Sequence, residues 1–481
     1  MTDYNKYEVV VGLEVHAQLQ TASKLFCGDS IAFGADPNTH VSPITLGHPG
    51  TLPKMNRKAV EYAIKMGLAC NCEIERHNYF ARKNYFYPDL PKGYQLSQHT
   101  TPVCKGGYIK ITVDGLEKNI SLNRIHIEED AGKSIHDNGD TYTRVDYNRA
   151  GTPLIEIVTE PDLRSGDEAF AYLTEIRKLV RYLEICDGNM EEGSLRCDAN
   201  ISVRLKGEEK LGIKVEVKNL NSIRNVKRAI EIESARLISI IESGGEIKQQ
   251  TRSFDANNGT TFSIRDKEDA DDYRYFAEPD LTPFDLQDGF IENIRITLPA
   301  LPWQRVHRYM NEMGLSEYDA LNLSDEKKIS DYFESVSEIT TNYKAIANWI
   351  NGPVKTWMNE QGKEITGFPI QPSQLAALIQ MVQNGRMSFS VASTKLFNQL
   401  LNEPAANVEQ TAQKMNLIQE SDSSALEPIV DAVLAKMTEK VNEYKKGKKG
   451  LLSLFVGEVI KHSKGKADPK VVNELLLNKL K

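Results

Sequence analysis

Carboxylate, imidazole and ammonium side chains recur at every second position of three short apolar segments, a spacing that could hold a hard cation beside a phosphate. In segment 7–19 the odd positions are apolar or small, whereas Glu14 and His16 occupy even positions. Because a strand alternates its side chains between two faces, Glu14 and His16 point the same way. Segments 197–205 and 213–218 repeat the pattern. Together they predict a sheet with one apolar face and one polar face suited to a metal and a phosphate.

The second and third segments contribute their own polar residues. Asp198 and Asn200 alternate with apolar residues, and Glu216 lies between Lys214 and Lys218. Each segment taken singly is better explained as a solvated strand face. Only their combination indicates a site for Mg²⁺ and phosphate.

Charged residues are also concentrated in the string His-Ile-Glu-Glu-Asp-Ala-Gly-Lys at 126–133. Its three consecutive acids repel one another unless a cation neutralises them. A period of two puts His126, Glu128 and Asp130 on one face and Glu129 on the other. Taken alone, the string is typical of an exposed acidic turn.

Lys83 precedes a compact aromatic run at 85–87 and a Pro-Asp turn. It either contacts phosphate or covers an aromatic minicore, and both interpretations stay open. Farther on, Glu156 is the single acid in the apolar segment 154–158, which is costly unless the acid is paired or exposed. The chain has no GxxxxGK[ST] and no GxGxxG motif, so an ATP site would depend on metal-holding carboxylates and scattered basic residues.

The length, charge and composition of the chain limit the classes of protein to which it can belong. A length of 481 residues suggests two to four domains. The net charge of −8 argues against a surface coated in basic residues, although a local basic patch is compatible with it. The N-terminus does not resemble a signal peptide, and no apolar run is long enough to span a membrane. We therefore expect a cytoplasmic protein without a membrane anchor, in which the six cysteines stay unpaired.

The order of the segments predicts three parts. Residues 1–295 combine short alternating strands with a few helices, which indicates an α+β domain with a mainly antiparallel sheet. Ser165 begins one of these helices and Ser222 marks the start of another. Residues 296–406 are predicted to form a helical domain. A third unit, 407–481, is expected to contain helices over 426–441, from 451, and after Asp468-Pro469.

Six strings, in this order, carry a family resemblance: Val11-Gly-Leu-Glu-Val-His16, Arg82-Lys-Asn-Tyr-Phe-Tyr-Pro-Asp89, Glu128-Glu-Asp-Ala-Gly-Lys133, Asn148-Arg-Ala-Gly-Thr-Pro-Leu-Ile-Glu156, Glu191-Glu-Gly-Ser-Leu-Arg-Cys-Asp-Ala-Asn200 and Asp271-Asp-Tyr-Arg-Tyr-Phe276. The chain resembles the B subunits of the bacterial aspartyl/glutamyl-tRNA(Asn/Gln) amidotransferases, the GatB/GatE family. The resemblance runs the whole length and includes a C-terminal unit similar to the YqeY-type tail.

The resemblance implies a glutamine-synthetase-like cradle over 1–295, then the helical domain, then a YqeY-like tail that binds tRNA. It implies a carbon–nitrogen ligase that phosphorylates the side-chain carboxylate of Glu-tRNA(Gln) or Asp-tRNA(Asn) with ATP. An amidase (glutaminase) subunit would hydrolyse glutamine to ammonia, and a third, small subunit would tie the heterotrimer together. The cofactors would be ATP and Mg²⁺.

The resemblance also assigns roles to residues. Metal binding would fall to Glu14, His16, Glu129 and Glu216. Catalysis would involve Glu14, His16, Lys83, Glu128 and Glu129, and the nucleotide would contact Lys83, Asp198, Asn200 and Lys218. The choice between Glu128 and Glu129 stays open, with a preference for Glu129 taken from the family.

The chain departs from many relatives at a zinc knuckle of the form CxC and CPxC. The matching stretches are Cys27-Gly-Asp29 and Ser42-Pro-Ile-Thr45, so Asp, Ser and Thr replace three of the four thiolates. Structural zinc prefers thiolate and imidazole ligands, and no structural zinc is expected.

Two other classes of function compete with this interpretation. A tRNA-binding scaffold would explain the lysines crowded in the tail, namely Lys445, Lys446, Lys448, Lys449, Lys461, Lys464, Lys466 and Lys470. It would not need a face of carboxylates and lysines. A free-standing small-molecule ligase would not need the helical domain and tail.

Overall fold

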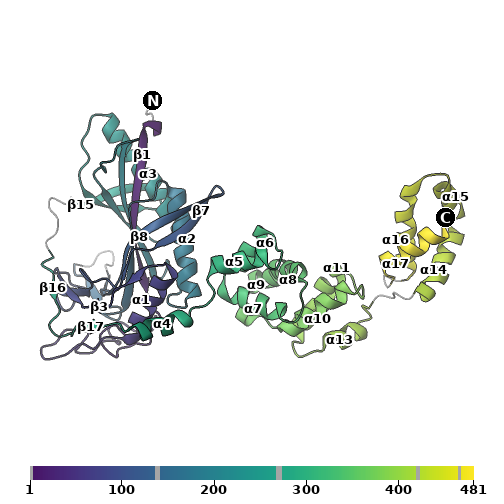
Figure 1. Cartoon of the computed structure of the whole chain (residues 1–481), viewed down its shortest axis with the longest axis horizontal. Coiled ribbons are helices and arrows are strands. Elements are labelled where there is room, and N and C mark those ends of the chain that lie inside the picture. Colours follow the sequence, from purple (N-terminus) through teal and green to yellow (C-terminus); the bar gives the residue numbers. More distant parts are fainter. Residues whose placement is uncertain (1–3, 136–140, 267–272, 419–422, 464–466, 481) are drawn as a thin grey trace. The chain divides into compact units, whose positions relative to one another are not determined.

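The computed structural model describes residues 4–135, 141–266, 273–418, 423–463 and 467–480. It divides into two compact units, Met1–Pro302 and Trp303–Lys481 (Figure 1). The strands of the first unit are β1 (Tyr7–Gln18), β2 (Glu73–Ile74), β3 (His77–Asn78), β4 (Ala81–Asn84), β5 (Tyr94–Ser97), β6 (Cys104–Lys105), β7 (Tyr108–Val113), β8 (Leu116–Glu129), β9 (Lys133–Ile135), β10 (Arg144–Asp146), β11 (Pro153–Thr159), β12 (Leu195–Leu205), β13 (Val215–Leu220), β14 (Gln250–Asp255), β15 (Thr260–Asp266), β16 (Phe276–Ala277) and β17 (Phe284–Asp285). Its helices are η1 (Tyr4–Lys6), α1 (Arg57–Ala69), α2 (Gly166–Tyr182), α3 (Ile223–Glu242) and α4 (Asp288–Ile296).

One ten-stranded sheet dominates the first unit. Its order is β15-β14-β13-β12-β1-β11-β8-β6-β2, with β7 paired to β8. Neighbouring strands are antiparallel except β13 and β14, which are parallel. The predicted α+β class with a mainly antiparallel sheet is therefore confirmed. Smaller sheets join β16-β4-β5, β17-β3 and β10-β9.

The central strand β1 shows the alternation that its sequence predicts. Val11, Leu13 and Val15 are at most 1% exposed, and they pack in the same core as α2 and α3. Figure 1 shows α2 and α3 running beside the sheet, and α3 contacts both β1 and β12. The opposite face of β1, which carries Glu14 and His16, is thus left for polar chemistry.

Side-chain caps start the helices that cover the apolar face. Ser165 accepts a hydrogen bond from Glu168 N, and Ser222 accepts one from Asn225 N. Both predicted helix starts are confirmed. Helix α1, which sequence analysis did not predict, begins after Asn56, whose side chain accepts from Lys58 N.

All the elements of the second unit within its described residues are helices. Its elements are α5 (Pro302–Asn311), α6 (Glu317–Leu323), α7 (Lys327–Ser337), α8 (Tyr343–Trp349), η2 (Ile350–Val354), α9 (Lys355–Gln361), η3 (Ile365–Gly367), α10 (Pro372–Gln383), α11 (Phe389–Val391), η4 (Ala392–Leu396), α12 (Phe397–Asn402), α13 (Val408–Lys414), α14 (Ser423–Lys436), α15 (Thr438–Lys445), η5 (Lys449–Leu451), α16 (Leu452–His462) and α17 (Pro469–Lys479). The prediction of a single helix over 426–441 is wrong. Met437 leaves helical geometry at φ −114° and ψ 36°, and the segment forms α14 and α15 instead.

The second unit contains two separate apolar clusters. One extends from Tyr309 to Ala412 and includes Val408, and the other extends from Leu426 to Leu480. The three-part division at 295 and 406 stays a prediction, but Val408 and Ala412 pack with the first of these two clusters. Among the described residues, no helix is both long and apolar enough to cross a bilayer.

We predict that Leu13→Ala lowers the free energy of unfolding of the sheet unit by about 2–5 kcal/mol, because it opens a cavity behind β1. Hydrogen exchange followed by mass spectrometry would report faster exchange in β1 and β12 peptides. The matched control is Leu205→Ala in β12, whose side chain is 43% exposed and whose replacement should change stability by less than about 0.5 kcal/mol. Equal effects of the two variants would contradict the packing described for β1.

Candidate active site

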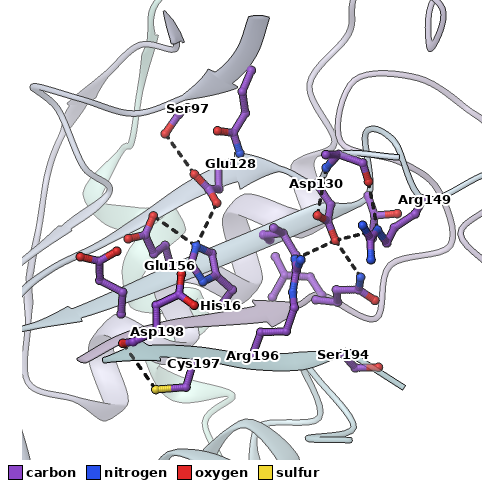
Figure 2. A pocket seen from close by; sticks show the side chains of 18 of the residues that line it. His16, Ser97, Glu128, Asp130, Arg149, Glu156, Ser194, Arg196, Cys197 and Asp198 are labelled. Atoms are coloured by element: carbon purple, nitrogen blue, oxygen red, sulfur yellow. Dashed lines mark hydrogen bonds and ion pairs between the residues drawn. The ribbon is translucent and has the colours of Figure 1, made fainter. Parts of the chain in front are cut away.

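The polar face of the consecutive sheet strands β13, β12, β1, β11 and β8 lines a cavity of about 1380 Å³. The strand register sets the rows of side chains across this face. Glu14 pairs with Asp198, and His16 pairs with Glu156 on one side and Arg196 on the other. Because paired residues of adjacent strands share a face, side chains distant in the sequence meet in the cavity. Figure 2 shows this convergence around His16.

The first cluster joins two imidazoles to two carboxylates. His16 Nε2 lies 3.5 Å from Glu128 Oε1 and 3.6 Å from Glu156 Oε2. His126 Nε2 lies 3.5 Å from Glu128 Oε2 and 3.2 Å from Glu156 Oε2. All four come from the adjacent strands β1, β11 and β8, so the sheet itself sets their spacing.

These contacts shift the protonation equilibria in opposite directions. Burial alone would lower the pKa of His16 and of His126, but Glu156 and Glu128 raise each pKa to about 9. Burial would raise the pKa of Glu156, yet the two histidines hold it well below its ordinary value. Without a metal, the cluster is therefore a network of ion pairs between imidazolium and carboxylate.

The second cluster joins three carboxylates from β1, β12 and β13. One oxygen from each of Glu14, Asp198 and Glu216 lies within 4.8 Å of the others. Lys218 Nζ lies 2.6 Å from Asp198 Oδ2 and 3.0 Å from Glu216 Oε1, and Asn200 Nδ2 donates to Glu14 Oε1 at 2.9 Å. The lysine and the amide offset part of the repulsion among the three acids.

A β-bulge places Lys218 over this cluster. Cys197 pairs with Leu220 whereas Ala199 pairs with Val217, so β13 carries one extra residue opposite β12. Asn219 accommodates the irregularity with a φ of 63°, a left-handed conformation that asparagine tolerates better than most residues. The bulge lies immediately beside Lys218 and Asp198, where it sets the direction of the ammonium group.

Burial and neighbouring charge act together on Glu14. Burial, Glu156 and Asp198 all raise the pKa of its carboxyl group. For Lys218, burial lowers the pKa, but Asp198 and Glu216 raise it by more. Lys218 therefore offsets the charges of Asp198 and Glu216, whereas Glu14 has no cation of its own among its contacts in the described chain.

Both clusters have donor atoms that suit divalent cations. The cluster of Glu14, Asp198 and Glu216 offers oxygen ligands, which Mg²⁺ prefers. The group of His16, Glu128 and Glu156 offers one nitrogen and carboxylate oxygens, again within 4.8 Å of one another. The residues therefore fit metal binding by their chemistry and spacing.

Lys83 lines the same cavity and lies against aromatic rings. Its Nζ is 4.8 Å from the ring centroid of Tyr273 and 5.7 Å from that of Tyr85. Burial lowers the pKa of Lys83, but Glu128 and nearby tyrosines raise it above its ordinary value. Both interpretations of this segment are thus compatible: a charged lysine faces the cavity and the aromatics pack around it. Asp271 and Asp272 of the adjoining motif lie outside the described residues.

The structure places Glu128 and Glu129 on opposite sides of β8. Glu128 lines the cavity with His16 and His126, as the period of two predicts. The Glu129 carboxylate instead contacts Lys92 Nζ at 2.6 Å and accepts from Leu96 N at 2.9 Å. It lines a smaller, separate cavity of about 220 Å³. Glu129 is thus the one residue of the predicted site that the main cavity does not include.

The other predicted residues, namely Glu14, His16, Lys83, Glu128, Asp198, Asn200, Glu216 and Lys218, all line the main cavity. Sequence reasoning left Glu156 and His126 without a role. The signal for Glu156 was present, since a lone acid in an apolar strand requires a partner. Its partners are the two histidines. Arg149 and Arg196 were also missed, because nothing in their own segments distinguishes them from surface cations.

The residues at the knuckle positions form a hydrogen-bonded cluster. Asp29 Oδ2 accepts from Cys27 Sγ at 3.3 Å, from Thr45 Oγ1 at 2.5 Å and from Ser42 N at 2.8 Å. Burial would raise the pKa of Asp29, but hydrogen bonds from Thr45 and Ser42 lower it. One ionised carboxylate thus holds both stretches together.

The segment that carries the sheet and both clusters matches a family of catalytic domains. Residues 9–292 match the GatB/GatE catalytic domain, and residues 331–480 match the GatB domain that includes the YqeY-like part. The chain belongs to the GatB/GatE family, as its six strings predicted.

Similar proteins cover the chain from end to end. A Geotalea daltonii protein, named as the B subunit of an aspartyl/glutamyl-tRNA(Asn/Gln) amidotransferase, is 51% identical over 479 residues, or 99% of each chain. A protein of Geobacter sulfurreducens with the same name is 49% identical over 478 residues, again 99% of each chain. The likeness therefore includes both structural units.

We predict that Glu128→Gln and Glu129→Gln have different consequences. Glu128→Gln should weaken Mn²⁺ binding by at least about tenfold, because it removes a charged ligand beside His16. Glu129→Gln should leave Mn²⁺ binding unchanged but lower the free energy of unfolding by about 1–3 kcal/mol, because Lys92 loses its ionised partner. Titration calorimetry and urea unfolding of both variants would separate the effects. Weaker Mn²⁺ binding by Glu129→Gln alone would assign the ligand to Glu129 instead.

Proposed function

We propose that this chain is the B subunit of a tRNA-dependent amidotransferase. It binds misacylated Glu-tRNA(Gln), Asp-tRNA(Asn) or both, activates the side-chain carboxylate with ATP, and amidates it. The observation that carries the proposal is the convergence of two acidic clusters and Lys83 in one cavity of a chain similar over its whole length to such subunits. Residues 1–295 would form a cradle domain with a glutamine-synthetase-like arrangement.

The reaction needs activation because hydroxide and oxide are very poor leaving groups. A side-chain carboxylate oxygen attacks the γ-phosphorus of ATP, the bond from that phosphorus to the β–γ bridging oxygen breaks, and ADP leaves with the electron pair. The product is an acyl phosphate. Ammonia then attacks the acyl carbon, the carbon–oxygen bond to phosphate breaks, and the nitrogen loses a proton as inorganic phosphate departs. Phosphoryl transfer of this kind depends mainly on positioning and charge neutralisation.

The residues of the cavity have the properties that this chemistry requires. Mg²⁺ held by Glu14, Asp198 and Glu216, and a second divalent cation held by His16, Glu128 and Glu156, would supply positive charge to the phosphates. Lys83 offers a charged ammonium group. Lys218 would offer another when Asp198 and Glu216, its carboxylate partners, bind a cation instead. Asn200 orients Glu14 through its amide hydrogen bond. In this assignment Glu128 takes the metal-binding role that sequence analysis leaned toward giving Glu129.

The proposal includes partners. Ammonia would come from an amidase subunit that hydrolyses glutamine, with a small third subunit completing a cytoplasmic heterotrimer. The tRNA would contact the tail, 407–481. In the described part of the tail, Lys445, Lys446, Lys448, Lys449, Lys461 and Lys470 are exposed, which suits contact with RNA phosphates. Lys464 and Lys466 lie outside the described residues.

The test is ATP turnover by the complex of this chain with its amidase and small partner subunits on Glu-tRNA(Gln), without an ammonia source. We expect ADP release, and hydroxylamine should trap the activated glutamyl group. Turnover with free glutamate would instead favour a free-standing ligase. Tight tRNA binding without ADP release would favour a scaffold.

We predict that Glu14→Gln reduces carboxylate activation by about 100-fold or more, because it removes a ligand of the cation that would position the phosphates. Affinity for tRNA should stay nearly unchanged, since the proposal assigns contact with the tRNA phosphates to the tail lysines and not to Glu14. ADP release and filter binding of labelled tRNA measure the two effects. A comparable loss of tRNA affinity would count against a metal-binding role.

Removing the tail should weaken tRNA binding and leave the glutaminase activity of the complex intact. Because Val408 and Ala412 pack in the cluster that begins at Tyr309, the truncated chain should end at Ile418. A full-length variant with Lys445, Lys446, Lys448 and Lys449 changed to Gln is the matched control, and it should show most of the same loss. Unchanged tRNA binding by both proteins would remove the assigned role of the tail.

A further inference from the structure

One corner of the cavity carries an excess of positive charge that neither metal cluster uses. Asp130 is the acid of this corner, and it is 5% exposed. Arg196 Nη2 donates to Asp130 Oδ2 at 2.8 Å, and Arg149 Nε lies 3.5 Å from the same oxygen. Figure 2 shows the carboxylate of Asp130 between the two guanidinium groups. Two cations thus contact one anion, and Glu128 and Asp198 act on Arg196 only from beyond ion-pair distance.

The two arginines differ in how their donors are used. Arg149 donates from Nε to Ala131 O at 3.0 Å and from Nη2 to Gly132 O at 2.7 Å, so it is held by the backbone. Within the described chain, Arg196 makes its contacts through Nη2 alone, and its buried Nε has no hydrogen-bond partner. An arginine has five N–H donors. Nε is closed off by burial, but the remaining N–H groups of Nη1 and Nη2 have no partner in the described chain, and the side chain is 36% exposed.

Asp130 is arranged to orient Arg196. Its Oδ2 also accepts from Gln18 Nε2 at 2.9 Å, and its Oδ1 accepts from Ala131 N at 2.9 Å. Burial would raise the pKa of Asp130, but Arg196 and Arg149 lower it, so the acid stays ionised. A carboxylate fixed on several sides holds its arginine partner in one orientation before a ligand arrives.

The position of Arg196 identifies the part of the substrate that it can meet. Arg196 pairs directly with His16 in the register of β1 and β12, and it shares a face with Asp198 two residues later. Carboxylates outnumber lysines and arginines among the residues that line the cavity. A substrate whose reactive group is itself a carboxylate is repelled there unless a cation with free donors receives it. The planar guanidinium matches a carboxylate with two parallel hydrogen bonds.

We propose that Arg196, oriented by Asp130, binds the side-chain carboxylate of the aminoacyl group and presents it for phosphorylation. This inference rests on the proposed function and adds the residue that recognises the reactive end of the substrate. Arg196 contacts the substrate, whereas Asp130 is a positioning residue. The alternative oxyanion is a phosphate of ATP, and the experiment separates the two.

The test compares Arg196→Gln and Arg196→Lys with the wild-type complex in ADP release on Glu-tRNA(Gln). Arg196→Gln should raise the KM for Glu-tRNA(Gln) by about 10- to 100-fold, with the KM for ATP changed by less than about twofold. Arg196→Lys should recover only part of the loss, because a lysine cannot form the paired hydrogen bonds. Uncharged tRNA(Gln), which lacks the carboxylate, should inhibit every variant with the same constant.

Two further variants distinguish recognition from a general field effect. Lys214→Gln removes a positive charge from an exposed lysine at the same cavity and should change neither KM. Asp130→Asn makes the corner more positive, so a field effect would lower the KM for Glu-tRNA(Gln). Loss of orientation would raise it, and that is the expected result. Thermal unfolding of each variant shows whether the fold is retained.

The outcomes are separable. Absence of ATP turnover in the wild-type complex would overturn the proposed function itself. Wild-type turnover with an unchanged KM for Glu-tRNA(Gln) in Arg196→Gln would overturn only the role of Arg196. A raised KM for ATP alone would also overturn it and assign Arg196 to phosphate.

Discussion

The sheet has to hold several carboxylates on one face, where they repel one another. Glu14, Asp198 and Glu216 converge from three strands, and Glu128 and Glu156 converge from two more. Such groups stay together only if the backbone holds them and cations lie between them. The sheet supplies the first condition through its hydrogen bonds and its buried opposite face. His16, His126 and Lys218 supply the second.

This arrangement explains why the cations come from the same strands as the acids. Lys218 belongs to β13 with Glu216, and His16 belongs to β1 with Glu14. A buried charge without a partner is far more costly than a buried pair. The face can therefore fold before any metal binds, with internal cations as temporary partners of the carboxylates. A divalent cation held by these acids would have to compete with them, and the ammonium group of Lys218 that it displaced would then be free to contact a phosphate.

Much of this face could be predicted from the sequence because a strand has a period of two. The alternation placed Glu14, His16, Asp198, Asn200 and Glu216 on polar faces, and it separated Glu128 from Glu129. The order of the strands could not be predicted this way. Glu156 meets His16 only because β11 lies between β1 and β8, and that neighbour relationship depends on long-range pairing.

The helices show the same limit. Ser165 and Ser222 reveal helix starts because a cap acts within a few residues. Asn56 caps α1 in the same way, so this helix start could have been predicted although it was not. The break at Met437 was missed because the helical spacing of apolar residues continues across it.

An acidic cavity is an unusual place for a reaction between two anions, a carboxylate and a triphosphate. Its acids favour metal binding, and bound cations reverse the sign of the local field. The corner at Asp130 and Arg196 is positive without a metal, because two arginines share one acid. The two ends of the cavity would thus differ in how they attract anions: one would depend on cations from solution, whereas the other uses arginines of the chain itself. That difference would allow the phosphates and the carboxylate to bind at separate places on one sheet face, close enough to react.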